Sequence, residues 1–247
     1  MIFNSIEFIF LFLPLALIIY YLTPMKARNY TMLILSLLFF SWGSQEYLIL
    51  IWTSVLVNYG LTRVMDRILV PSVRKTFFIG ILTFNLLILF VFKYLGFFFT
   101  NINGLVGTQF FSERLAQPLG ISFFTFQVLS YVIDVYKQRY EAEYSLPKLA
   151  LYFLMFPQLA SGPIMRWDEL KPQMGQRMVR PQLMADGAER FTIGLFKKVF
   201  IANTLAALWN IAKTADPAGL SMLFAWVGII AFTLYIYFDF SGYMDMA

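Results

Sequence analysis

The stretch AGLSMLFAWVGIIAFTLYIYF, residues 218–238, decides the fold class, because it runs for 21 residues without a charge before Asp239. An α-helix needs about 20 mostly apolar residues to cross the hydrocarbon core of a bilayer. The stretch is therefore predicted to be a membrane-spanning helix.

Similar apolar runs occur along the whole chain. The other predicted membrane segments are 8–22, 25–43, 45–63, 76–99, 118–136, 149–165 and 191–209. The run 149–165 contains Pro157 and the pair Gly162-Pro163, which bend or break a regular helix, so a short or re-entrant segment is predicted there. The sequence thus predicts an all-α, polytopic membrane bundle of about seven or eight segments, forming one membrane domain over residues 1–247.

The composition agrees with a membrane protein and limits its chemistry. Hydrophobic residues make up 60% and charged residues 13%, against about 45–50% and 25% in soluble domains. The chain has no cysteine and no histidine, which excludes disulfides, thiolate metal sites and an imidazole base within these residues. It also has no GxxxxGK[ST], HExxH or GxSxG motif, so nucleotide-driven transport, zinc hydrolysis and a hydrolase elbow lack support, and no metal is expected.

The basic residues indicate orientation rather than nucleic-acid binding, although the net charge is +5. Lys and Arg gather in the gaps 23–30, 63–75 and 137–148, whereas the gap 43–46 has none and 100–117 has only Arg114. Short loops that are rich in Lys and Arg usually face the cytoplasm. This alternation places the N-terminus outside.

Two polar features interrupt the apolar pattern near residue 160 and within 118–136. The stretch FPQLASGPIMR, residues 156–166, leaves backbone groups unpaired at membrane depth, which requires protein or water to satisfy them. It is either the wall of a cavity or a proline kink packed against its neighbours. Gln127 and Asp134 are seven residues apart on a predicted helix and so share one of its faces.

Two charged features lie near the end of the sequence. Asp239, in the stretch YIYFDFSGYMD (residues 235–245), either faces a polar interior or ends its helix at the interface, since a carboxylate in the membrane costs at least ~2.5 kcal/mol. Lys197 and Lys198 lie on a helix face with Arg190 and Gly194. Extension of these lysines to anionic lipid headgroups is favoured over a dedicated phosphate site.

The motifs, taken in order, resemble the membrane-bound O-acyltransferase family, specifically its bacterial alginate O-acetyltransferase branch. The blocks that carry the resemblance are 1–22, PLGISFFTFQ (118–127) with 131–136, FPQLASGPIMR (156–166), GLFKKVFIA (194–202) and YIYFDFSGYMDMA (235–247). The resemblance therefore extends from one end of the sequence to the other.

The resemblance implies an enzyme that transfers an acyl group, usually acetyl, from a cytoplasmic thioester donor to hydroxyls of an extracytoplasmic polysaccharide. The donor would be acetyl-CoA or an acyl carrier, and the other expected partners are membrane lipid and a periplasmic acetyltransferase, with no nucleic acid. In the family a histidine after the FDFSGY block acts as general base, so the chain is expected to be the N-terminal portion of the fold, with that histidine beyond Ala247 and no catalytic residue among these 247. The chain alone is then expected to be inactive.

The expected substrate path and location follow from the same resemblance. The location is the bacterial cytoplasmic (inner) membrane. The residues expected to line the path are Gln127, Ser161, Arg166, Asp239, Ser241 and Tyr243.

Two other classes of function remain open from the sequence. One is a non-catalytic membrane scaffold or pseudoenzyme in a complex that modifies or exports polysaccharide. The other is a transporter, which would normally show paired broken helices in two related halves, whereas only one clear broken segment is found.

Overall fold

The fold is described here from a computed structural model, for residues 5–106, 117–118, 120–159, 161–175, 180–216 and 221–247. These residues form helices, turns and irregular segments without a strand, so the predicted all-α membrane bundle is confirmed. The chain divides into two compact units. The hairpin unit comprises Met1–Leu15, Ser161–Pro163 and Met178–Ala247, and the central unit comprises Ala16–Ala160 and Ile164–Arg177.

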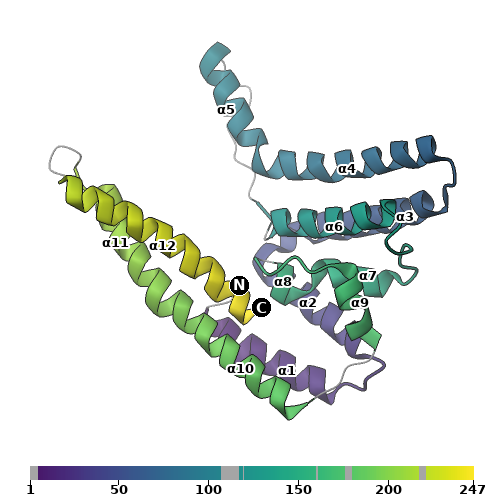
Figure 1. Ribbon diagram of the computed structural model, residues 1–247, viewed down its shortest axis with the longest axis horizontal. Coiled ribbons are helices and arrows are strands. Elements are labelled where there is room, and N and C mark those ends of the chain that lie inside the picture. Colours follow the sequence, from purple (N-terminus) through teal and green to yellow (C-terminus); the bar gives the residue numbers. More distant parts are fainter. Residues whose placement is uncertain (1–4, 107–116, 119, 160, 176–179, 217–220) are drawn as a thin grey trace. The chain divides into compact units, whose positions relative to one another are not determined.

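Two long antiparallel helices dominate the hairpin unit (Figure 1). The first runs without interruption over Pro181–Thr214 and consists of α10 (Pro181–Phe196), a π-helical turn η3 (Lys197–Ala202) and α11 (Asn203–Thr214). The second is α12 (Met222–Met246), which packs along all three of these elements. Ser221 caps α12, because its Oγ accepts the backbone N–H of Phe224 at 3.2 Å.

Small residues allow the two helices of the hairpin to approach closely. A Cβ added at Gly194 would lie 2.5 Å from the Gly242 carbonyl oxygen, and one added at Gly242 would lie 2.7 Å from the Gly194 carbonyl oxygen. Farther along, a Cβ on Gly228 would lie 2.5 Å from that of Ala212. Close backbone contact between small residues is the usual way in which membrane helices associate, because lipid offers no hydrophobic drive for it.

The described part of the central unit consists mainly of helices that follow α1 (Leu13–Leu22). They are α2 (Arg28–Ser44), α3 (Leu48–Arg67), α4 (Pro71–Lys93), α5 (Leu95–Val106), α6 (Ile121–Tyr136), α7 (Leu146–Leu154), α8 (Phe156–Leu159) and α9 (Trp167–Gly175). A π-helical segment Phe8–Phe12 leads into α1 before them. Gly120 has a φ of 68° at the start of α6, a backbone conformation that suits glycine because it has no Cβ.

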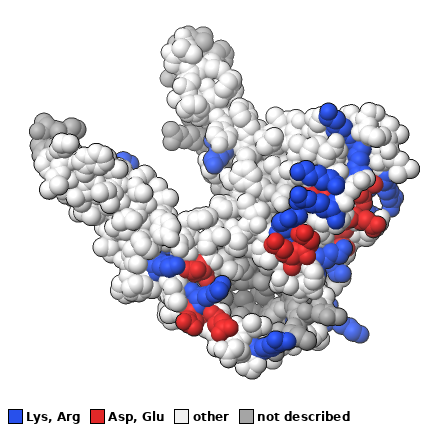
Figure 2. Space-filling view, viewed as in Figure 1, with Lys and Arg blue, Asp and Glu red and all other residues white. Residues whose placement is uncertain are grey.

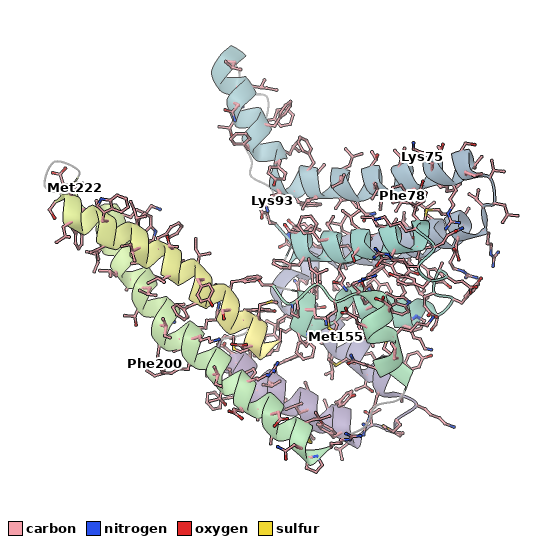
Figure 3. The ribbon with its side chains drawn as sticks, in the orientation of Figure 1. Lys75, Phe78, Lys93, Met155, Phe200 and Met222 are labelled. Atoms are coloured by element: carbon pink, nitrogen blue, oxygen red, sulfur yellow. The ribbon has the colours of Figure 1, made fainter. Side chains whose placement is uncertain are left out.

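The core of the central unit lies around α6 and α7. Every residue from Leu149 to Leu154 is buried, and α6 buries Val128, Tyr131 and Val132. The Phe78 ring of α4 stacks on the Tyr136 ring of α6 with their centroids 4.1 Å apart (Figure 3). The indole of Trp167, at the start of α9, is fully buried and meets the Tyr152 ring edge to face.

Among the described residues, four helices are long and apolar enough to cross a membrane: Gln45–Arg67, Pro71–Lys93, Pro181–Thr214 and Met222–Met246. Two shorter apolar helices are Phe8–Leu22 and Ile121–Tyr136. The predicted segment 76–99 differs in its bounds, because the helix ends at Lys93 and α5 begins at Leu95. On the face of the molecule shown in Figure 2, charged side chains gather in mixed patches of both signs, and the rest of the described surface is mostly uncharged.

Candidate functional site

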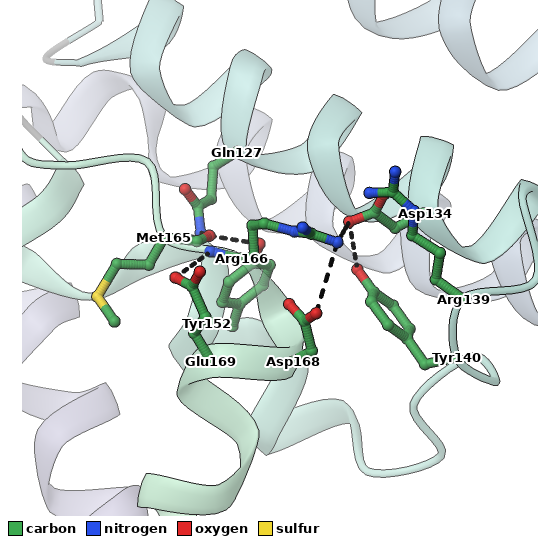
Figure 4. A network of polar contacts seen from close by, with 9 residues as sticks. All are labelled: Gln127, Asp134, Arg139, Tyr140, Tyr152, Met165, Arg166, Asp168 and Glu169. Carbon is green, nitrogen blue, oxygen red and sulfur yellow. Dashed lines mark hydrogen bonds and ion pairs between the residues drawn. The ribbon is translucent and has the colours of Figure 1, made fainter.

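In the central unit, the polar face of α6 forms hydrogen bonds with the irregular segment between α8 and α9. Gln127 Nε2 donates to the Met165 carbonyl oxygen at 2.9 Å, and Tyr152 Oη donates to the same oxygen at 2.9 Å (Figure 4). Gln127 is 5% exposed and Tyr152 is 1% exposed. A carbonyl that no helix pairs thus receives two buried donors, as backbone at membrane depth requires.

The break itself is satisfied in the same way. The helix stops at Met155, and α8 starts with Phe156 and Pro157, so Pro157 lies in the first turn where its missing N–H costs nothing. The Phe156 N–H donates to Ser36 Oγ of α2 at 3.1 Å, and Ser36 is fully buried. These contacts are what a kink packed against its neighbours predicts.

Asp134 forms the centre of a charged cluster one turn from the end of α6. Its side chain is 6% exposed, and its Oδ1 accepts from Arg139 Nη1 at 2.7 Å. Its Oδ2 accepts from Arg166 Nη2 at 3.3 Å, and this Nη2 also lies 3.4 Å from Asp168 Oδ2. The Tyr140 hydroxyl lies 3.5 Å from Asp134 Oδ2 (Figure 4). Arg166 therefore bridges two carboxylates rather than standing as an isolated cation.

Tyr140 lies between α6 and α7 and serves this cluster as a neutral donor. Burial raises the pKa of its hydroxyl well above the usual value near 10, and the charges of neighbouring groups such as Asp134 act in the same direction. The phenol therefore keeps its proton at neutral pH and can donate to the carboxylate.

A second charged cluster lies inside the hairpin unit. Lys197 Nζ donates to Asp245 Oδ2 at 2.5 Å and to Ser241 Oγ at 3.2 Å, and Lys198 Nζ donates to Asp239 Oδ1 at 2.6 Å. The Lys198 side chain is 11% exposed and that of Lys197 28%. Both lysines are paired with carboxylates of α12. The sequence had instead favoured extension of these lysines to lipid headgroups. Helix α12 continues through Asp239 to Met246, so Asp239 does not end its helix.

The structure distributes the six expected path residues between the two units. In the central unit, Gln127 and Arg166 meet at the segment 165–166, where Gln127 bonds the carbonyl that precedes Arg166. In the hairpin unit, Asp239 and Ser241 join the lysine cluster, and Tyr243 is buried on α12. Ser161 is partly exposed in the irregular stretch after α8.

Sequence reasoning missed several members of these clusters. Arg139, Tyr140 and Tyr152 were not singled out, although Asp134 and Arg139 stand five residues apart across the end of α6. No three described His, Cys, Asp or Glu side chains come together as metal ligands would.

Comparison with known proteins gives the chain a clear set of relatives, although no family model matches it. It is 37% identical over 255 residues to the probable alginate O-acetylase AlgI of Pseudomonas aeruginosa, covering 100% of this chain and 48% of that protein. It is 36% identical to the protein of the same name from Azotobacter vinelandii, and the match covers 100% of this chain and 50% of that protein. It is 32% identical to the peptidoglycan O-acetyltransferase of Helicobacter pylori, and the match covers 100% of this chain and 53% of that protein.

The chain thus spans about half the length of the curated relatives it matches. The match covers this chain from one end to the other, so the aligned region includes the residues of both charged clusters and of the broken helix. The resemblance to the alginate O-acetyltransferase branch of the membrane-bound O-acyltransferases is therefore confirmed.

Proposed function

We propose that this chain belongs to the working part of a membrane-bound O-acyltransferase. The reaction moves an acyl group, most simply acetyl, from a cytoplasmic thioester donor such as acetyl-CoA or an acyl carrier to hydroxyls of an extracytoplasmic polysaccharide. The observation that carries the proposal is the 32–37% identity, over 100% of this chain, to proteins named O-acetylases and O-acetyltransferases.

The location and partners are part of the same proposal. The helices of spanning length make the chain a membrane protein, and the alternating basic gaps support a bacterial cytoplasmic membrane with the N-terminus outside. A polysaccharide acceptor and a periplasmic acetyltransferase partner fit that orientation. The two units would act within one membrane domain.

The residues present suit binding and positioning better than proton abstraction. The chain has no histidine, so no imidazole base comes from these 247 residues. What it supplies is polar groups at membrane depth, which ordinarily mark substrate or ion pathways. Gln127, Ser161, Arg166, Asp239, Ser241 and Tyr243 are proposed to line the path.

Because this chain spans about half the length of its relatives, the test expresses the full open reading frame that contains it, in a bacterium that exports polysaccharide but has lost its own O-acetylase. Ester-linked acetate on the exported polymer is measured by proton NMR before and after mild base treatment. Base-labile acetate that depends on the gene is the expected result. Unacetylated polymer, from cells in which the protein is present in the membrane, would contradict the proposal and favour a non-catalytic scaffold.

A further inference from the structure

Two neighbouring lysines in the hairpin unit have different surroundings. Lys197 and Lys198 each pair with their own aspartate of α12, at 2.5 Å and 2.6 Å. Only Lys197 also contacts a hydroxyl, the Oγ of Ser241, at 3.2 Å. The two lysines are therefore alike in charge and in pairing with an aspartate, and Lys197 has an additional contact with a hydroxyl.

The contact determines how the Ser241 hydroxyl is used. Lys197 pairs with Asp245, and an ammonium can only donate hydrogen bonds. Ser241 Oγ therefore accepts, and its own proton is left to be donated elsewhere. The threonines 192, 204 and 233 in the same unit donate to the carbonyl four residues earlier in their helices. In the described part of the chain, the Lys197 contact is the hydrogen bond that Ser241 makes.

The local backbone presents both lysines to α12. Consecutive residues of an α-helix point about 100° apart, so two adjacent lysines do not ordinarily share one partner helix. Lys197 and Lys198 open the π-helical turn η3, and π-turns inside α-helices occur frequently at functional sites. The Gly194–Gly242 contact one turn away brings the backbones close enough for the pairs to form.

We propose that Lys197 is a positioning residue, which holds the Ser241 hydroxyl as a hydrogen-bond donor to the acyl carbonyl during transfer. The Lys198–Asp239 pair beside it holds the two helices together and has no such role. This inference rests on the proposed function. Lys198 is the matched control, because it is the adjacent lysine and also pairs with an aspartate of α12, whereas the Ser241 contact is made by Lys197.

The step balances without a further reactant. The acceptor hydroxyl oxygen attacks the thioester carbonyl carbon, and the carbonyl π electrons move to the oxygen, which the Ser241 hydroxyl stabilises. The intermediate collapses with cleavage of the C–S bond, and the thiolate leaves. The proton lost by the acceptor ends on that thiolate, so the products are an O-acyl ester and a thiol.

The first experiment tests the Lys197–Ser241 contact without enzyme activity. The chain contains no cysteine, so Ser241→Cys introduces a single thiol, whose alkylation by iodoacetamide at pH 7 is followed by mass spectrometry in purified protein. A neighbouring ammonium favours the reactive thiolate. Adding Lys197→Gln is expected to slow alkylation about tenfold, Lys197→Arg to preserve the rate, and Lys198→Gln to change it less than twofold. Equal slowing by the Lys197→Gln and Lys198→Gln changes, or none by the former, would overturn the contact.

The second experiment tests the role in transfer. The gene is expressed as above, and the acetate that mild base releases from the polymer is measured in membranes. Ser241→Ala and Lys197→Gln should each lower kcat by about tenfold to a hundredfold with little change in KM, and the double variant should lose no more than either. Ser241→Thr should retain activity, because it keeps the hydroxyl. Full activity in Ser241→Ala, or additive losses in the double variant, would overturn the role. An inactive wild-type protein would instead overturn the proposed function itself, while the alkylation result still reports the contact.

Discussion

At the scale of single residues, several charges within the helices are held by partners of opposite charge. Lys198 and Asp239 are joined at 2.6 Å although 41 residues apart, and Asp134 accepts from Arg139 and Arg166. Removing one member of a buried pair leaves the other charge uncompensated, which costs more than the pair itself contributes. The pairs therefore specify which helices pack together.

A double-mutant cycle checks this for the Lys198–Asp239 pair. Lys198→Met is expected to lower the free energy of unfolding by about 1–3 kcal/mol, because Asp239 is left without its partner. Lys198→Met combined with Asp239→Leu should recover at least half of that loss. The measurement is thermal unfolding of the detergent-solubilised protein, and a double variant as unstable as the sum of the two singles would show that the residues are not coupled.

At the scale of helices, the glycines of the hairpin set the distance between its two long helices. Gly194→Ala places a Cβ 2.5 Å from the Gly242 carbonyl oxygen, so the helices must separate and the lysine pairs must stretch. Gly187→Ala is the matched control in the same helix α10, since a Cβ there has nothing within 4 Å. We expect Gly194→Ala to lower the melting temperature by several degrees and Gly187→Ala to leave it unchanged or raise it. Similar melting temperatures for both variants would show that the close approach does not matter.

The broken helix offers a second test at this scale. Ser36 accepts the buried N–H of Phe156, so Ser36→Ala removes this hydrogen bond at a cost of about 1–3 kcal/mol. Ser41→Ala on the same helix α2, where the side chain is partly exposed, should cost less than about 0.5 kcal/mol. Chemical denaturation in detergent measures both. Equal effects from the two serines would mean that the break is not held by Ser36.

The helices could be predicted from the sequence more fully than the contacts between them. Runs such as 218–238 predict a membrane helix by their length and lack of charge alone. The prolines near residue 160 predict the break in the helix. The end of α4 at Lys93 was missed, because the apolar run continues through Tyr94 into α5. The lysine pairs could not be located in advance, since they join residues 41 and 48 positions apart and depend on how α12 packs.

At the scale of the whole molecule, the alternation of basic gaps predicts an orientation that the absence of cysteine makes easy to test. Glu46 lies in a gap predicted to be outside and Glu141 in one predicted to be cytoplasmic, and both side chains are exposed. Glu46→Cys should react with a membrane-impermeant maleimide in intact spheroplasts. Glu141→Cys should react only after the membrane is opened, and the opposite pattern would reverse the proposed topology.

The proposed function requires that acyl groups pass from a cytoplasmic thioester to a polymer on the other side of the membrane. Inverted membrane vesicles that contain the protein and trapped polysaccharide are supplied outside with acetyl-CoA labelled in its acetyl group, and base-labile label on the trapped polymer is measured. We expect label on the polymer that depends on the protein and on the thioester. Label that stays on the donor side, with the protein inserted and the polymer present, would contradict the proposed function.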